Sequence, residues 1–212
     1  MNQLRLSLEP RPKHVSEFSD EWGRLTFAIL IGSERIVLLD VRWNVLEFAE
    51  WFVEHWTFLC QHKLIIEGDA IAEHENLSQA MNRLYDKDFE SQTDFDRWHE
   101  KLDELSYWTH HSIHAGFEGA AVPPILIGCN RGQGEISHVE RIPDPFKGQG
   151  AFVKPGDWQY EIDIADFLRS VSQEMLAYMH RISSTIPASE LPRVMKVVQA
   201  LERFPTDINC CG

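Results

Sequence analysis

Cysteine is scarce in this sequence, and its positions do not form a metal-binding pattern. The four cysteines are Cys60, Cys129, Cys210 and Cys211, and the absence of a CxxC pair argues against a zinc cage built from thiolates. Cys129 falls in an apolar, strand-like run, which predicts an inert buried thiol rather than a nucleophile. A cytoplasmic, reducing compartment is the default expectation for such a chain.

Long apolar runs are also missing. Residues Met1–Pro12 lack the apolar core of a signal peptide, and the longest apolar stretches elsewhere are too short to cross a bilayer. We therefore expect neither a signal peptide nor a membrane partner.

Positive charge is in the minority. The chain has 20 Lys and Arg against 33 Asp and Glu, which gives a formal net charge of −13, and it has no cluster of four or more basic residues. Because proteins bind nucleic acids largely through Lys and Arg, we expect no direct binding of DNA or RNA. The acidic balance suits solubility, or a protein partner with a basic surface. An inhibitor that mimics nucleic acid is a further alternative, although the acidic residues are spread along the chain.

Signatures of the common catalytic sites are absent. The sequence contains no GxSxG, no GxxxxGK[ST] and no HExxH, which are patterns of serine hydrolases, P-loop proteins and zinc peptidases. The short run Gly132-Gln133-Gly134 lies between strand-like segments, so we predict a hairpin turn there rather than a phosphate loop. These absences favour a protein without enzymatic activity.

What the sequence does contain is ample material for a hydrophobic core. Its 212 residues include seven Trp and twelve Phe, and 43% of them are hydrophobic, as expected of a folded globular protein. This length suits one domain spanning 1–212, with 1–61 and 93–204 as alternative sub-domains.

Alternating and continuous apolar runs predict the strands, because side chains in a strand point to opposite faces in turn. The predicted strands are 4–8, 25–32, 35–41, 122–129, 135–139 and 158–164. The second and third of these form one predicted hairpin, and the fourth and fifth form another. Residues 9–23 and 142–156 are predicted loops.

Apolar residues at helical spacing predict the helices. The predicted helices are 45–61, 78–85, 94–115, 167–182 and 189–201. Asn44 is the predicted N-cap of the first helix, and Thr93 or Asp94 that of the third. The tail from Pro205 is predicted to be loose. The order of these elements favours an α+β fold with antiparallel sheet and packed amphipathic helices.

Residues 106–114, SYWTHHSIH, contain three histidines. If one helix covers 94–115, His110 and His114 lie one turn apart on the same face, a spacing that lets two imidazoles bind one Zn²⁺ or Mn²⁺. The candidates for a third ligand are Glu73, His74, Glu75 and His138. A metal-dependent hydrolase or a metal-regulated protein is therefore one functional hypothesis, and the alternative is a polar helix face without any cofactor.

His111 lies on a different face of the same predicted helix. It precedes two glycines, Gly116 and Gly119, which break the helical pattern. We therefore predict that His111 donates hydrogen bonds to carbonyl groups left unpaired where the helix ends.

The same run also has the form W-x2-H-x7-G-x3-P, which comprises Trp108, His111, Gly119 and Pro123. An apolar strand and then Glu135-Ile136-Ser137 follow. This resembles a poorly characterised domain of bacterial proteins encoded in defence and conflict loci, sometimes alongside zinc-peptidase domains. Residues 162–182 resemble the closing amphipathic helix of that domain.

Two features depart from this pattern. The domain usually has Trp after the serine, where this chain has His138, and Cys129-Asn130-Arg131 only approximates its Arg-bearing strand. The resemblance implies a recognition or assembly role in bacterial defence or toxin immunity, with no established catalytic residue. It makes His111 the fixed histidine and leaves His110 and His114 as neighbours. Our first hypothesis is accordingly a non-enzymatic, cytoplasmic subunit that acts by binding another protein.

Overall fold

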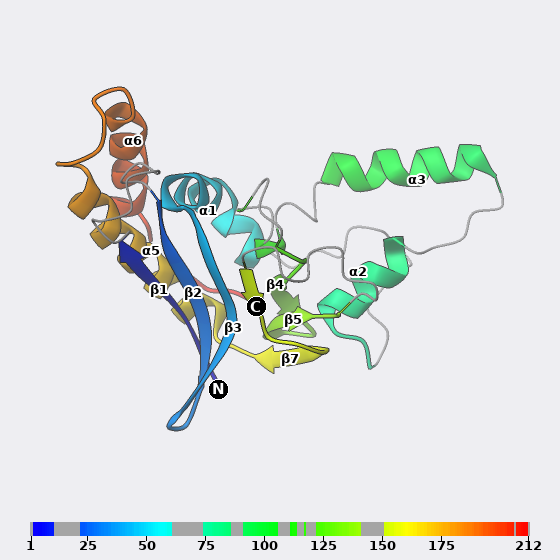
Figure 1. Ribbon diagram of the computed structural model, residues 1–212. Coiled ribbons are helices and arrows are strands. Elements are labelled where there is room, and N and C mark those ends of the chain that lie inside the picture. The colour runs from blue at the N-terminus through cyan, green and yellow to red at the C-terminus, as the bar shows by residue number, and fades with distance from the viewer. Residues whose placement is uncertain are drawn as a thin grey trace.

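The computed structural model describes residues 2–10, 22–60, 74–85, 91–105, 111–113, 117, 122–140, 151–205 and 207–211. Within these ranges the chain forms five helices and two separate antiparallel sheets (Figure 1). Helices pack against both sheets, so the predicted α+β class with antiparallel strands is confirmed. Among the helices of the described residues, none is long and apolar enough to cross a membrane.

The first sheet has four strands and contains the predicted N-terminal hairpin. Its strands, in spatial order, are β1 (Gln3–Pro10), β2 (Trp22–Ile31), β3 (Glu34–Asn44) and β6 (Ala151–Val153), with antiparallel neighbours throughout. The β2–β3 hairpin pairs Ile31 with Glu34 across a turn in which Gly32 has a φ of 61°, a conformation that glycine adopts without steric cost. The three leucines of β1 are buried on one face, as their alternation predicts.

Two stretches predicted as loops belong in part to this sheet. β2 begins at Trp22, inside the predicted loop 9–23, and β6 lies inside the predicted loop 142–156. β6 pairs with residues 39–41 of β3. A strand of three residues is too short to show an alternating pattern, and its partner is remote in sequence, so its pairing leaves no local signal.

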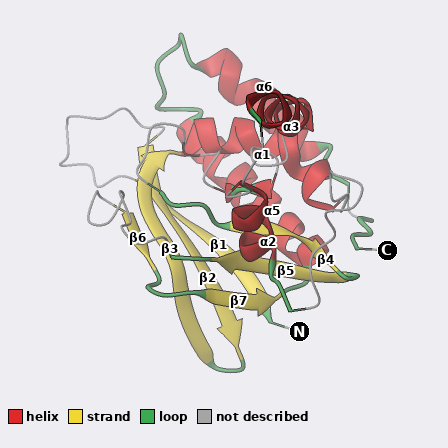
Figure 2. Ribbon diagram, turned by 90° about the vertical axis from the view of Figure 1, so that its right-hand side faces the viewer, coloured by secondary structure: helices red, strands yellow, loops and turns green. Residues whose placement is uncertain are grey.

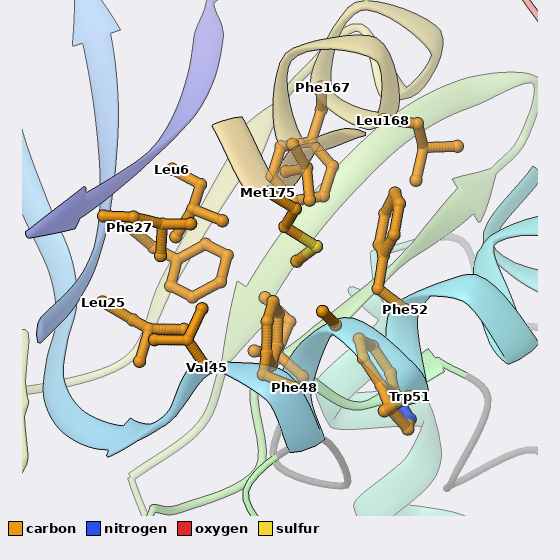
Figure 3. Close-up of a cluster of buried hydrophobic side chains, with 14 of the residues drawn as sticks. Leu6, Leu25, Phe27, Val45, Phe48, Trp51, Phe52, Phe167, Leu168 and Met175 are labelled. Atoms are coloured by element: carbon orange, nitrogen blue, oxygen red, sulfur yellow. The ribbon is translucent and has the colours of Figure 1, made fainter. Parts of the chain in front are cut away.

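Three helices build the main core on the first sheet. They are α1 (Val45–Cys60), α5 (Ile164–Ile182) and α6 (Leu191–Glu202), of which α1 and α5 contact the sheet and α6 contacts both helices. Figure 2 shows the strands of this sheet on one side of the molecule and α1 on the other. Figure 3 shows Leu25 and Phe27 of the sheet beside Phe48 of α1, and Phe52 of α1 beside Leu168 of α5. The apolar face predicted for the first helix is therefore the buried one.

The start of α1 carries the predicted cap. Asn44 Oδ1 accepts hydrogen bonds from the backbone N–H groups of Leu46, at 3.0 Å, and Glu47, at 3.3 Å. Glu47 Oε1 in turn accepts from Asn44 Nδ2 at 3.3 Å. These contacts satisfy two of the N–H groups that a helix leaves unpaired at its first turn, so the prediction of Asn44 as N-cap is confirmed.

A forked ion pair fixes α6 on α1. Arg193 donates to Glu50 of α1 from Nε, at 3.0 Å, and from Nη2, at 2.7 Å, and it also donates to Glu190 at 2.7 Å. The hydrogen bond to Glu50 is the largest reason that the pKa of Arg193 lies above its usual value. The pair therefore connects the two helices at the surface, above the apolar contacts of α6 with the core.

The second sheet has three strands and carries a short helix. In spatial order the strands are β4 (Leu126–Asn130), β5 (Gln133–His138) and β7 (Trp158–Glu161), and α2 (Leu77–Tyr85) packs against β4 and β5. The predicted β4–β5 hairpin is present, but its turn lies at Arg131 and Gly132, whereas Gln133 and Gly134 of the predicted turn belong to β5. Phe48 of α1 stacks on Phe117, with ring centroids 4.9 Å apart, and apolar residues of both sheets belong to one core cluster.

The helix predicted over 94–115 differs from the observed α3 (Gln92–Leu105) at both ends. The cap is Ser91 rather than Thr93 or Asp94, because Ser91 Oγ accepts from the backbone N–H of Asp94 at 3.2 Å. Ser112 pairs with Leu126 in an antiparallel β-bridge, so one continuous helix to 115 is wrong.

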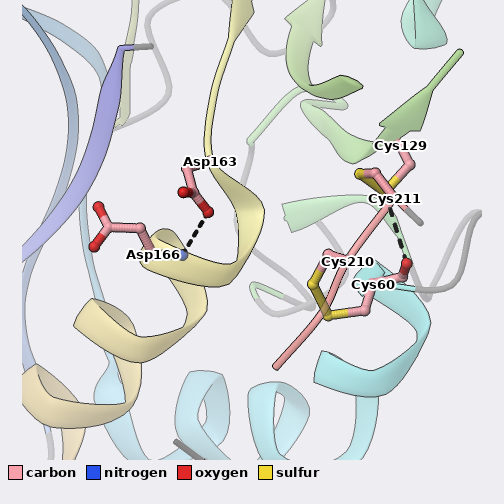
Figure 4. Close-up of a disulfide and its surroundings, with 6 residues drawn as sticks. All are labelled: Cys60, Cys129, Asp163, Asp166, Cys210 and Cys211. Carbon is pink, nitrogen blue, oxygen red and sulfur yellow. Dashed lines mark hydrogen bonds between the residues drawn. A yellow bond between two sulfur atoms is a disulfide. The ribbon is translucent and has the colours of Figure 1, made fainter. Parts of the chain in front are cut away.

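The cysteines differ most from expectation. Cys60 is bonded to Cys210, and Cys129 to Cys211, as Figure 4 shows. The prediction of a free, inert thiol at Cys129 is therefore wrong, although Cys129 is buried as expected. The tail predicted to be loose from Pro205 is instead joined covalently to α1 and β4. Pairings across 150 and 82 residues have no local sequence signature, which is why cysteine spacing alone did not predict them.

Candidate functional site

Of the residues in the histidine-rich run and the pattern that contains it, the structure describes His111 and Pro123, and both are buried. Trp108, His110, His114 and Gly119 lie outside the described residues. Of the candidate third metal ligands, Glu73 also lies outside, whereas His74, Glu75 and His138 are described. The metal site at His110 and His114 therefore stays a prediction, but the single helix on which its spacing rested is interrupted at Ser112. Within the described ranges, no group of three or more His, Cys, Asp or Glu side chains is arranged to hold a metal ion.

His111 joins its own segment to the second sheet. Its side chain is buried, and Nδ1 lies 2.9 Å from the backbone oxygen of Ile127 in β4. Because a carbonyl oxygen can only accept, Nδ1 carries the proton in this contact. The hydrogen bond to a carbonyl was predicted, but the carbonyl belongs to a strand rather than to a helix end. The neighbouring backbone continues the attachment, since Ile113 N–H donates to Ile125 O at 2.9 Å.

Gly128 leaves room for the His111 ring. A Cβ added at Gly128 would lie 2.9 Å from His111 Nδ1, which is closer than Cβ atoms in proteins approach a non-bonded atom. We expect Gly128→Ala to lower the free energy of unfolding by about 1–3 kcal/mol, because either the ring or the strand must move. In a His111→Ala background the same change should cost less than about 1 kcal/mol, since the clashing ring is gone. Urea unfolding of the four proteins of this cycle measures the coupling, and equal costs in both backgrounds would contradict it.

Glu135 is the centre of a buried polar network on β5. Its side chain is only 2% exposed, and three groups donate to its carboxylate. Oε1 accepts from the backbone N–H of Leu77 at 2.7 Å, and Oε2 accepts from Asn130 Nδ2 at 2.7 Å and from Gln159 Nε2 at 2.9 Å. These donors come from α2, β4 and β7. One carboxylate therefore connects both neighbouring strands and the first residue of α2, where the helix dipole favours negative charge.

Ser137, two residues along the same strand, holds the next residue of α2. Ser137 Oγ accepts from the backbone N–H of Ser78 at 3.1 Å, and Ser78 Oγ donates to the backbone oxygen of Ser137 at 2.8 Å. The start of α2 is also capped by Asn76, whose Oδ1 accepts from Gln79 N–H at 2.8 Å. Residues at alternate positions of β5 thus take up N–H groups that α2 leaves unpaired at its start.

His138 and Pro124 attach the segment that precedes β4. Nδ1 of His138 lies 2.8 Å from the backbone oxygen of Pro124, and the ring of His138 packs against Trp158 with centroids 5.4 Å apart. His138 is one of the candidate third metal ligands, and its Nδ1 is therefore already used in a hydrogen bond at the end of the sheet. Pro123, the last residue of the W-x2-H-x7-G-x3-P pattern, directly precedes this contact.

A cavity of about 320 Å³ lies beside the sheet. It is lined by 132–134 of the β4–β5 turn and strand, by 162–165 at the start of α5, by Arg169 and by the C-terminal residues 208–211. Asp163 in this lining is the N-cap of α5 and accepts from Asp166 N–H at 2.9 Å. The volume is at the small end of ligand sites, and the acid, guanidinium and amide groups around it suit a polar molecule.

Sequence reasoning selected His111 but missed the part played by Glu135. Glu135 was noted only as a member of the Glu-Ile-Ser run, because an acidic residue in an alternating strand is usually exposed. The available signal was its place in a short strand-like run just after the hairpin turn, between Gly134 and the apolar Ile136. Its donors come from positions as far apart as Leu77 and Gln159, and nothing in the sequence indicates that they meet.

Comparison with known proteins identifies no relative of this chain. No protein-family model, no curated protein and no solved structure matches the chain.

Proposed function

We propose that this protein acts by binding another protein, as a non-enzymatic subunit of a bacterial defence or toxin-immunity system in the cytoplasm. One observation supports the proposal. The polar residues in the stretch that resembles the defence-locus domain form hydrogen bonds within the protein. Glu135 and Ser137 hold α2 on the second sheet, and His111 holds the segment before β4. Side chains committed in this way maintain a shape, whereas catalysis needs groups directed at a substrate. A maintained shape is what a recognition or assembly module needs.

The net charge of the chain indicates which kind of surface the partner has. A net charge of −13 attracts a basic surface at long range and repels acidic ones. We therefore propose a protein partner with a basic face, encoded in the same locus. Long-range attraction of this kind raises the rate of association more than it slows dissociation.

The first test is to purify the tagged full-length protein from its native host, identify a stoichiometric partner, and rebuild the complex from the two purified proteins. Metal content is measured on the same sample. A one-to-one complex without metal supports the proposal. A monomer that binds no protein encoded beside it contradicts it, and zinc or manganese that is lost in His110→Ala/His114→Ala would favour the metal hypothesis instead.

Salt dependence gives a quantitative prediction for the rebuilt complex. Raising NaCl from about 0.05 M to about 0.5 M should lower the association rate at least about tenfold, because screening shortens the reach of the charges. The dissociation rate should change much less. Stopped-flow mixing or surface plasmon resonance measures both rates. An association rate that is independent of salt would show that the partner does not recognise the acidic charge.

A further inference from the structure

The C-terminal residues 207–211 are attached to the fold mainly by two adjacent disulfides. Cys210 is bonded to Cys60 at the end of α1, and Cys211 to Cys129 in β4 (Figure 4). Because α1 packs on the first sheet and β4 belongs to the second, these two neighbouring cysteines connect the two halves of the molecule. The sequence separations are 150 and 82 residues.

Few other interactions hold this segment. Among the described residues, no hydrogen bond or ion pair joins 207–211 to the rest of the chain. Ile208, Cys210 and Cys211 are partly buried against the core, so apolar contact is the remaining attachment. The segment also forms one wall of the cavity, which is lined as well by Gly132–Gly134 and Ile162–Ala165. Breaking the two disulfides would therefore release a wall of the cavity without breaking the polar network around Glu135.

We propose that Cys60, Cys129, Cys210 and Cys211 form a reversible dithiol–disulfide site, at which a dithiol reductant releases residues 207–211 and opens the cavity. The proposal goes beyond the binding role above, and it rests on the positions of the cysteines together with the cytoplasmic location proposed there. Disulfides in a reducing compartment are usually transient and serve redox sensing or catalysis. A tail attached by disulfides is compatible with a cytoplasmic location if the disulfides can be reduced and re-formed.

The expected course of exchange at each disulfide follows from the burial of its two cysteine residues. Cys129 is 1% exposed, whereas Cys60, Cys210 and Cys211 are partly exposed. A thiolate of the reductant attacks Sγ of Cys211, the S–S bond breaks, and Cys129 leaves as a thiolate that takes up a proton. The second thiol of the reductant then attacks the mixed disulfide. This step releases Cys211 as a thiol and leaves the reductant as a disulfide.

The Cys60–Cys210 bond opens by the same two steps. Each disulfide therefore consumes one dithiol and yields two cysteine thiols, so complete opening produces four thiols. Closing needs a disulfide oxidant that accepts the same electrons. Both cysteines of the Cys60–Cys210 bond are partly exposed residues, so we expect this bond to be reduced before the Cys129–Cys211 bond, which has one buried residue.

The test uses the folded full-length protein and counts thiols. Protein purified without reductant is incubated with dithiothreitol under native conditions, quenched in acid, denatured, alkylated and weighed by mass spectrometry. We expect no alkylated cysteine before reduction, then two, then four, and a return to none when glutathione disulfide replaces the reductant. Four thiols before reduction, or disulfides that open only in denaturant, would overturn the proposal.

Limited proteolysis tests whether reduction releases the tail. Endoproteinase Asp-N, which cleaves before aspartate, should cut before Asp207 faster in the reduced protein, while α5 stays resistant. The Cys210→Ser/Cys211→Ser variant is the matched control, because its tail has no disulfide and should be cut equally fast with or without dithiothreitol. Equal cleavage rates for the native tail in both redox states would overturn the release step. Rapid cleavage throughout the chain would show that the disulfides are purely structural.

Single variants check the pairing without relying on the double variant. In Cys60→Ser the C-terminal tryptic peptide should remain bonded to the peptide containing Cys129, and in Cys129→Ser to the peptide containing Cys60. A peptide with a Cys210–Cys211 bond and no attachment to either partner would contradict the assigned pairs.

Discussion

Replacing Phe48 with alanine is expected to lower the free energy of unfolding by about 3–5 kcal/mol, which is the usual cost of removing a buried aromatic ring. Phe48 is 1% exposed and contacts both parts of the core. Its ring lies 5.8 Å from that of Phe27 in β2 and 4.9 Å from that of Phe117, centroid to centroid. Removing it leaves a cavity between the first sheet and the segment leading to the second, where neighbouring rings cannot close the gap fully.

The measurement is thermal and urea unfolding of the purified variant. For a chain of this length the change corresponds to a fall in Tm of about 6–20 °C. Phe58→Ala is the matched control, because Phe58 lies on the same helix and is 39% exposed; its cost should stay within about 1 kcal/mol. Equal costs for the two variants would mean that the face of α1 assigned to the core is not the one that stabilises the protein.

The elements predicted correctly are those specified by residues close together in the chain. The apolar face of α1 and its cap at Asn44 are both specified within a few residues, since a helix repeats every 3.6 residues and a cap acts over three. The β2–β3 hairpin is similar, because a two-residue connector sets its register as far as the irregularity between Phe27 and Ala28. Local periodicity was therefore enough to predict the fold class.

The features that were missed depend on partners distant in the sequence. β6 owes its strand conformation to β3, and Ser112 is pulled out of a helical pattern by pairing with Leu126. In each case the hydrogen bonds to the remote strand outweigh a weak local preference, which is worth only tenths of a kcal/mol per residue. The disulfides belong to the same class, because only the folded chain brings Cys60 and Cys129 to the C-terminal cysteines.

The candidate site combines both situations. His111 was selected from its own short pattern, and its hydrogen bond to a backbone carbonyl was foreseen, although the carbonyl belongs to Ile127. The burial of the Glu135 carboxylate could not be predicted in the same way, because the three groups that donate hydrogen bonds to it lie on three different elements. A buried acid is tolerated only where such donors meet, and sequence does not reveal that meeting.

Replacing Glu135 with alanine is expected to cost about 3–5 kcal/mol of unfolding free energy. The change removes the acceptor of the buried backbone N–H of Leu77 and one of the two acceptors of the buried Asn130 amide, which also donates to Glu75 O at 3.2 Å. Gln159 is exposed, so its amide can turn to water instead. Each unsatisfied buried group costs about 1–3 kcal/mol, and partial rearrangement recovers some of the total. The expected loss is therefore at the high end of single substitutions.

Glu135→Gln distinguishes the cost of the lost hydrogen bonds from the cost of the lost side-chain volume. Glutamine fills the same space but has one acceptor oxygen, so it can keep either the Leu77 contact or the two side-chain contacts with their present orientation. We expect an intermediate cost of about 1–2 kcal/mol. Glu161→Ala is the control, because Glu161 lies directly opposite Glu135 on β7 and is exposed. Its cost should stay within about 0.5 kcal/mol.

Local opening distinguishes a docking role for Glu135 from a general contribution to stability. If the carboxylate holds the start of α2 on β5, then Glu135→Ala should raise hydrogen exchange in 77–85 before it raises exchange in α5, which packs in the main core. A uniform loss of protection in both helices would instead mean that Glu135 supports the whole fold. Preferential opening of α2 has a functional consequence, since a partner that contacts this helix should then bind Glu135→Ala more weakly than Glu161→Ala at a temperature where both remain folded.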